Sequence, residues 1–186
     1  MKKVIILIVV VLALFISIKA YQHYLSIYPY ASINPVSDIV IITNFNNCIS
    51  AGNPAMESYP RKCRSGNQTF IEDIGNELEK MDLIRIDTPR PNQLISSPLQ
   101  ISGEARGYWF FEGDFPIEIY DGNNNLLGSG YATADGDWMT EGFVFFISEL
   151  EFTTPDTKTG LLILKKDNPS DLTENDDQLE VPVVFK

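Results

Sequence analysis

Residues 95–152 read ISSPLQISGEARGYWFFEGDFPIEIYDGNNNLLGSGYATADGDWMTEGFVFFISELEF, and this stretch decides the fold. Short apolar or alternating runs are separated by turns rich in Gly, Asn and Asp about ten residues apart, a pattern typical of a β-sandwich or barrel. Asp121–Asn125 predicts a hairpin loop, and Asp135–Asp137 predicts a turn that directs Trp138 toward the core. No run has the period and length of a helix, which argues against a βαβ fold.

The same pattern of short apolar runs separated by turns continues on both sides of this stretch, from Ile84 to the C-terminus. In the last run, Leu179 to Phe185, apolar residues take alternate positions, as a half-buried strand requires. About 100 residues with seven short strands match an all-β, immunoglobulin-like β-sandwich, which we assign to residues 84–186. The predicted strands are Ile84–Asp87, Leu99–Ala105, Ile117–Tyr120, Leu126–Thr133, Phe143–Thr153, Gly160–Lys165 and Leu179–Phe185. Because the sandwich contains no cysteine, packing alone must hold its two sheets together.

Residues 95–152, with their continuation TGLLILKKDNPSDLTENDDQLEVPVVF (159–185), resemble the immunoglobulin-like domain of bacterial spore germination proteins. The resemblance spans about residues 84–186. It implies two β-sheets, no known cofactor, and a binding or spacing role. Because such proteins often join this domain to a second, distinct one that is not seen here, we expect a general cell-surface role first. The pieces that carry the resemblance are Ser97-Pro98, Ser102–Ala105, Trp109–Glu112, Gly136–Trp138 and Leu164–Pro169.

The N-terminus carries an apolar segment. Lys2 and Lys3 precede fifteen residues, Val4–Ile18, which is short for a membrane span and fits either a cleaved secretory signal or an anchor running to about residue 28. The best cleavage site, Ile18–Ala20, is poor because it contains Lys19. We therefore predict a transmembrane signal anchor over residues 1–28, with membrane lipid as its partner and the C-terminal part outside the cytoplasm.

A spacer (29–43) then leads to a two-cysteine segment (44–70). Asn44 can cap a short helix that Gly52 ends. Cys48 and Cys63 are the only cysteines, and an even pair in an exported chain predicts a disulfide. The alternative, a redox or metal pair, lacks the close spacing of a CxxC motif.

This segment also resembles a short two-cysteine motif of exported bacterial proteins, through Cys48, Ala51-Gly52, Pro54, Met56–Arg61 and Cys63. Arg61, Lys62 and Arg64 form a basic group that suits either an anionic partner or a solvated loop. Residues 71–83 are predicted as a linker or as part of one short helix from Thr69 to Leu83. Its apolar residues would be Phe70, Ile74, Leu78 and Met81.

Composition and charge exclude several kinds of chemistry. The chain has 14 basic and 25 acidic residues, a net charge of −11, which argues against nucleic-acid binding. Because the chain has only one histidine, His23, the sequence argues against Ser-His-Asp and Cys-His catalysis and against most zinc sites.

Two acidic groups are candidate sites. Asp135 and Asp137 lie in a tight turn around Gly136, which does not suit the pair of carboxylates of a glycosidase. The acidic stretch 167–177 matches no calcium loop and is interpreted as solvated. We predict no catalytic, metal or cofactor site.

The strongest candidate for a ligand surface is the aromatic run Tyr108, Trp109, Phe110 and Phe111. Four consecutive aromatics cannot all face one core, so most should pack between the sheets and at least one should be exposed. The sequence therefore predicts a non-enzymatic, membrane-anchored binding or adhesion module of the bacterial envelope that engages a protein or a cell-wall glycan. The alternative is a structural spacer or an accessory subunit of an envelope complex, with a sporulation or germination role.

The first prediction concerns the N-terminus. Because the segment lacks a good cleavage site, the mature protein should keep residues 1–28. Intact-mass measurement of the membrane-extracted protein is the check. A mass that begins near Tyr21 would contradict the anchor and make the protein secreted.

Overall fold

A computed structural model describes residues 2–27 and 41–186, which fall into two compact units, residues 1–42 and 43–186. In the first unit, α1 (Lys2–Ile27) covers residues 2–27 of the predicted anchor (1–28) and contains the single histidine, His23. Among the residues that the structure describes, no helix combines the length and apolar character that crossing a membrane requires. Most of the predicted spacer (29–43), namely residues 29–40, lies outside the described residues.

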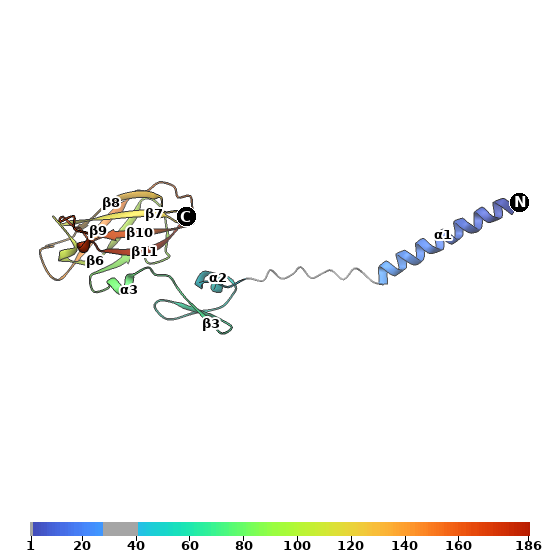
Figure 1. Cartoon of the computed structure of the whole chain (residues 1–186), viewed down its shortest axis with the longest axis horizontal. Helices are drawn as coiled ribbons and strands as arrows, with labels where there is room; N and C mark the ends of the chain where they lie inside the picture. The colour runs from blue at the N-terminus through green and yellow to red at the C-terminus, as the bar shows by residue number, and fades with distance from the viewer. Residues whose placement is uncertain (1, 28–40) are drawn as a thin grey trace. The chain divides into compact units, whose positions relative to one another are not determined.

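The second unit contains one curled sheet of eight strands in the order β4-β6-β9-β8-β7-β10-β11-β5 (Figure 1). Neighbouring strands are antiparallel except β11 and β5, which are parallel. The sheet confirms the predicted β architecture and all seven predicted strands. The strands form one sheet and not the two that were expected, because β8 and β9 pair through Thr133 with Ile147 and Ala134 with Phe146. Only the two-residue β5 was missed. The strands are β4 (Ile84–Thr88), β5 (Leu94–Ile95), β6 (Leu99–Arg106), β7 (Asp114–Asp121), β8 (Leu126–Ala134), β9 (Phe143–Leu150), β10 (Thr159–Lys165) and β11 (Gln178–Phe185).

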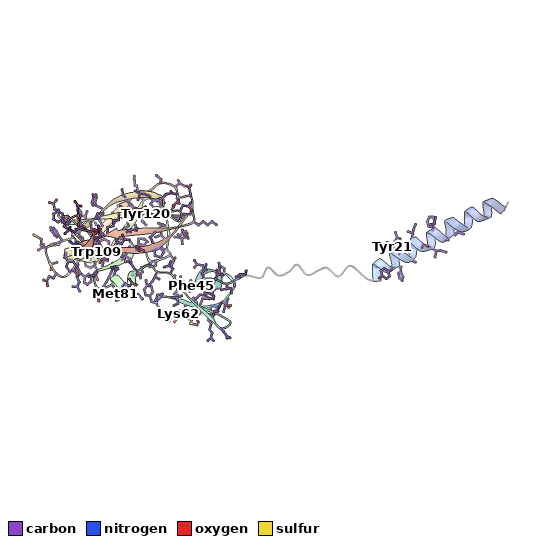
Figure 2. All side chains as sticks on the ribbon, viewed as in Figure 1. Tyr21, Phe45, Lys62, Met81, Trp109 and Tyr120 are labelled. Atoms are coloured by element: carbon purple, nitrogen blue, oxygen red, sulfur yellow. A yellow bond between two sulfur atoms is a disulfide. The ribbon has the colours of Figure 1, made fainter. Side chains whose placement is uncertain are left out.

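The core lies between the two halves of the curled sheet. In β7 and β11 every second residue is buried, as the side-chain alternation of a strand requires. Phe115 is central, with its ring 5.0 Å from that of Phe146 and 5.2 Å from that of Phe110. Trp109 is fully buried within the sandwich (Figure 2), and Trp138 packs against the same core, as the Asp135–Asp137 turn predicted.

The predicted hairpin loop joins β7 to β8. The Asp121 carboxylate accepts hydrogen bonds from the backbone N–H groups of Asn123 (2.9 Å) and Asn125 (2.8 Å). Asn124 has φ of 65°, a left-handed conformation that asparagine tolerates well. The DGNNN run therefore forms this turn through its own side chains and backbone.

Residues 43–80 form a smaller element that precedes the sandwich. It contains α2 (Phe45–Ser50), a three-stranded sheet of β1 (Ala55–Met56), β2 (Lys62–Ser65) and β3 (Gln68–Ile71), and α3 (Glu77–Lys80). Asn44 caps α2 by accepting from the Asn47 N–H at 2.8 Å. The Cys48–Cys63 disulfide, fully buried with the two Cα atoms 6.1 Å apart, ties α2 to β2. The predicted disulfide is confirmed, and it leaves neither cysteine free as a metal ligand.

One helix from Thr69 to Leu83 does not form. Residues up to Ile71 pair with β2 as strand β3, and Gly75, with φ of 67°, interrupts the chain before the four-residue α3. Ile74 is buried, whereas Leu78 and Met81 are exposed. The apolar residues that predicted the helix therefore do not lie on one buried face. The linker interpretation of residues 71–83 is the better description of this stretch.

An ionic clamp holds the two-cysteine element against the sandwich. We use this name for Tyr59, Arg61, Glu72, Glu77 and Arg90. Arg61 donates two hydrogen bonds to Glu72, at 2.7 and 2.5 Å. Arg90, from the loop after β4, pairs with Glu77 at 2.7 Å and donates to the Tyr59 hydroxyl at 2.8 Å, and that hydroxyl donates to Glu77. Glu72 and Glu77 are both buried, so these partners are needed to offset the loss of water.

The clamp lowers the pKa of Glu72. The bond from Arg61 is the main cause, and burial opposes it. Burial and the bond to Glu77 raise the pKa of the Tyr59 hydroxyl. The Glu72 carboxylate therefore contributes stability above its unfolded pKa of about 4.3, and this stability is lost as pH falls through the lower folded value.

Asn76 covers the free edge of β11. Its side-chain amide donates to the Gln178 carbonyl at 3.0 Å and accepts from the Glu180 N–H at 2.8 Å, which is the pairing that a neighbouring strand would supply. Gly75 makes this approach possible, because a Cβ there would lie 1.9 Å from the Glu180 carbonyl oxygen. The linker thus completes the sheet edge that β5 leaves open.

We predict that Gly75→Ala lowers the free energy of unfolding by about 3 kcal/mol, from left-handed strain and steric overlap together. Gly66→Ala is the matched control, because Gly66 also has a left-handed φ, 57°, but has no neighbour near its Cβ position. It should cost only about 1 kcal/mol. Urea unfolding followed by tryptophan fluorescence measures both, and equal losses would contradict the role of Gly75 at the β11 edge.

Candidate functional site

Three loops meet at one end of the sandwich, and we call this region the loop end. They are residues 107–113, 135–142 and 166–177. The Gly107 N–H donates to the Gly142 carbonyl at 3.1 Å, and the Asp167 N–H donates to the Trp109 carbonyl at 3.0 Å. The fold thereby brings together three stretches that the sequence analysis considered separately: the aromatic run, the Asp135–Asp137 turn and the acidic segment.

The aromatic run divides between the core and the surface. A 3-10 turn, η1 (Gly107–Trp109), points successive side chains in different directions. Trp109 and Phe110 are buried, whereas Tyr108 is 50% exposed and Phe111 is 43% exposed. The candidate ligand surface therefore reduces to Tyr108 and Phe111, and ligand binding there stays a prediction.

The loop end is strongly acidic. Its loops together with Asp114, the first residue of β7, contain ten acidic residues and one lysine, whereas the loops at the opposite end (89–98, 122–125 and 151–158) contain two of each sign. Among the described residues, Asp177 is the one carboxylate of these three loops that forms an ion pair, with Lys80 at 2.5 Å. The acidic residues are Glu112, Asp114, Asp135, Asp137, Glu141, Asp167, Asp171, Glu174, Asp176 and Asp177.

The pKa of Asp167 is set first by burial and then by its neighbours. Burial raises the pKa of Asp167, and the charges of Asp114 and Glu112 raise it further, against a hydrogen bond from the Asn168 backbone. Two polar atoms at this end, Trp109 Nε1 and Asp114 Oδ1, are buried without a hydrogen-bond partner in the structure. Within the described residues, no three His, Cys, Asp or Glu side chains are grouped so that they could hold a metal ion.

A second exposed surface was not anticipated from the sequence. Tyr131 on β8 (64% exposed) and Phe145 and Ile147 on β9 (61% and 60%) project from the outside of the sheet. We call these three residues the outer apolar face. The alternation in FVFFIS (143–148) was the available signal, because it places Phe143, Phe145 and Ile147 on the face opposite to Val144 and Phe146.

The basic group of the two-cysteine element is not a free cationic site. The Arg61 guanidinium is bound by Glu72 and also lies 5.3 Å from the Phe45 ring centroid. Lys62 and Arg64 are exposed. Lys62 and Arg64 lie on strand β2 and not on the predicted loop, and their solvated side chains together with the bound Arg61 do not form an anionic-partner site of three side chains.

The curled sheet, its central aromatic core and the loops gathered at its ends define the class of the domain, an immunoglobulin-like β-sandwich. Residues 83–173 match the model of a family described as the immunoglobulin-like domain of bacterial spore germination. This match confirms the resemblance predicted from the sequence, and the disulfide supports the two-cysteine motif. No match was found among curated proteins or among solved structures.

The crowding of carboxylates leads to a pH prediction. Because the pKa of Asp167 is raised in the folded state, its ionised form costs stability at neutral pH. Asp167→Asn should therefore raise the free energy of unfolding at pH 7 by about 0.5–1 kcal/mol, and the gain should vanish below about pH 3.9. Glu174→Gln, an exposed change in the same loop, is the control and should change stability by less than about 0.5 kcal/mol at either pH. Thermal unfolding at both pH values measures this.

Proposed function

We propose that this protein is a non-enzymatic binding module of the bacterial cell envelope, and that its loop end is the binding surface. The observation that carries the proposal is the pair of exposed rings, Tyr108 and Phe111, on loops positioned by a rigid sandwich. Half-exposed aromatic side chains supply contact area to a protein groove or a sugar ring. Loops at the end of a β-sandwich are also where binding residues concentrate in this architecture.

The charge of the loop end favours a class of ligand. Unpaired carboxylates next to aromatic rings suit a ligand that carries positive charge, since both carboxylates and ring faces attract cations. An envelope protein with exposed Lys or Arg fits this requirement. A cell-wall glycan with free amino groups also fits it.

In this proposal, residues 1–28 anchor the protein in the membrane and the C-terminal part lies outside the cytoplasm. The support is the apolar run Val4–Ile18 behind Lys2 and Lys3, together with the disulfide, since disulfides persist in oxidising compartments. A spacer and the two-cysteine element would then separate the sandwich from the membrane.

The second candidate function is a structural spacer or an accessory subunit of an envelope complex, with a role in sporulation or germination. The match of residues 83–173 to a spore germination family favours it. The ionic clamp also favours it, because a two-cysteine element held firmly to the sandwich would transmit a fixed orientation.

Capture of envelope components distinguishes the two candidates. The full-length chain, cross-linked in intact cells, should retain a specific partner that the double variant Tyr108→Ser/Phe111→Ser loses at least about tenfold, because stacked aromatic anchors dominate such contacts. Leu126→Ser is the matched control, since Leu126 is equally exposed but lies in the hairpin at the opposite end. A partner retained equally by all three chains would favour the spacer or accessory role.

A further inference from the structure

One strand carries an ordered row of side chains on its outer surface. From one end of β9 to the other these are Phe143, Phe145, Ile147 and Glu149, while the residues between them face the core or are partly buried. The row spans about 20 Å, at about 3.3 Å per residue. Its two central members, with Tyr131 beside them, make up the outer apolar face.

The first end of the row is cationic. The Phe143 ring contacts two guanidinium groups, with Arg85 Cζ 4.2 Å and Arg106 Cζ 4.1 Å from its centroid. Arg85 is neutralised by Glu104 at 2.8 Å. Arg106 donates to the carbonyls of Asp82 (2.9 Å) and Glu141 (3.2 Å), and forms no ion pair with any described residue, so its charge is uncompensated.

The other end of the row is anionic. Glu149 is exposed and accepts a hydrogen bond from the Gln100 amide, which carries no charge. Among the described residues it has no cationic partner. The row therefore runs from an unpaired cation, across two exposed apolar side chains, to an unpaired anion.

Such a row is complementary to itself. A two-fold axis parallel to the sheet and perpendicular to β9, crossing above the point midway between Phe145 and Ile147, would place Phe145 over Ile147 of a second copy. The same axis would place Arg106 opposite Glu149, twice, as an isologous interface requires. We propose that the outer apolar face is the interface of a homodimer, formed with a second copy of this chain.

Two features make close approach feasible at this face. Ser102 and Thr133, the residues opposite Ile147 on the neighbouring strands, are small, so the ring of a partner's Phe145 has space beside Ile147. The outward charges of β4, β6 and β9 nearly cancel, with two cationic and three anionic side chains, whereas the loop end holds ten acidic residues. Two chains of net charge −11 therefore repel each other less here than at the loop end, especially since charge is screened beyond about 8 Å at physiological salt.

The dimer is tested on the full-length chain in mild detergent, by light scattering over a concentration series. Wild type should dimerise with rising concentration, since three apolar side chains form a smaller interface than the about 800 Å² per partner of a standard complex. Ile147→Lys should weaken dimerisation at least about tenfold. Leu126→Lys, an equally exposed apolar position away from the face, should have no effect.

Charge reversal tests the two-fold arrangement itself. Arg106→Glu and Glu149→Lys should each weaken self-association, because like charges would meet twice. An equimolar mixture of the two variants should dimerise again, because each variant supplies the charge that the other lacks. No other occupant of the face predicts this recovery.

Three outcomes would overturn the proposal: a wild-type chain that stays monomeric at the highest concentration it tolerates, a dimer unchanged by Ile147→Lys, or a mixture that fails to recover. A dimer held by α1 would give the second outcome, because Ile147→Lys leaves α1 intact and would not weaken such a dimer. Near-ultraviolet circular dichroism checks folding. If Arg106→Glu disturbs the fold through its lost carbonyl bonds, the exposed positions Ile147 and Glu149 still decide the result.

Discussion

Aromatic packing between the halves of the curled sheet is the constraint on which the rest of this protein depends. The sandwich has no cysteine and no metal group among its described residues, so Phe115, Phe146 and Trp109 must supply its cohesion by burial. Burying side chains of this size contributes roughly 1.5–3 kcal/mol each relative to exposure. A core packed in this way makes the sandwich rigid, and the rigid sandwich holds its irregular loops in defined positions at the ends of the sheet.

The two-cysteine element shows a different way of holding a small structure together. It has few large apolar residues, and it depends on the buried disulfide, on the ionic clamp and on the Asn76 amide at the edge of β11. The clamp residues Tyr59 and Arg61 belong to the segment that resembles a motif of exported proteins, and their partners are the buried carboxylates Glu77 and Glu72. Arg61 therefore holds the element together, and Tyr59 also joins it to the sandwich, because its hydroxyl accepts a hydrogen bond from Arg90.

The surface of the sandwich is divided by charge and by polarity. The loop end concentrates carboxylates around Tyr108 and Phe111, while the outer apolar face has balanced charge around Phe145 and Ile147. A binding surface for other molecules and a contact surface for a second copy would then lie on different parts of one domain. The first is formed by loops and the second by β8 and β9, and the two adjoin at Arg106, which donates to the Glu141 carbonyl.

The sequence by itself determined the strands, the DGNNN hairpin and the disulfide, because each depends on local alternation, on turn-forming residues or on a pair of cysteines with no competitor. Only the tertiary structure decided which aromatics of the 108–111 run are exposed, since a 3-10 turn and the packing of Phe110 on Phe115 set their directions. It also decided that residues 69–83 divide into a strand and a short helix, because pairing with β2 and the edge of β11 outweighed a helical apolar spacing. The alternation in FVFFIS (143–148) indicated part of the outer apolar face, but the pairing of β8 with β9 was needed to add Tyr131 to it. Sequence spacing carries no information about which distant segment will pair with a strand edge, and that is why the clamp and the loop end appeared only in three dimensions.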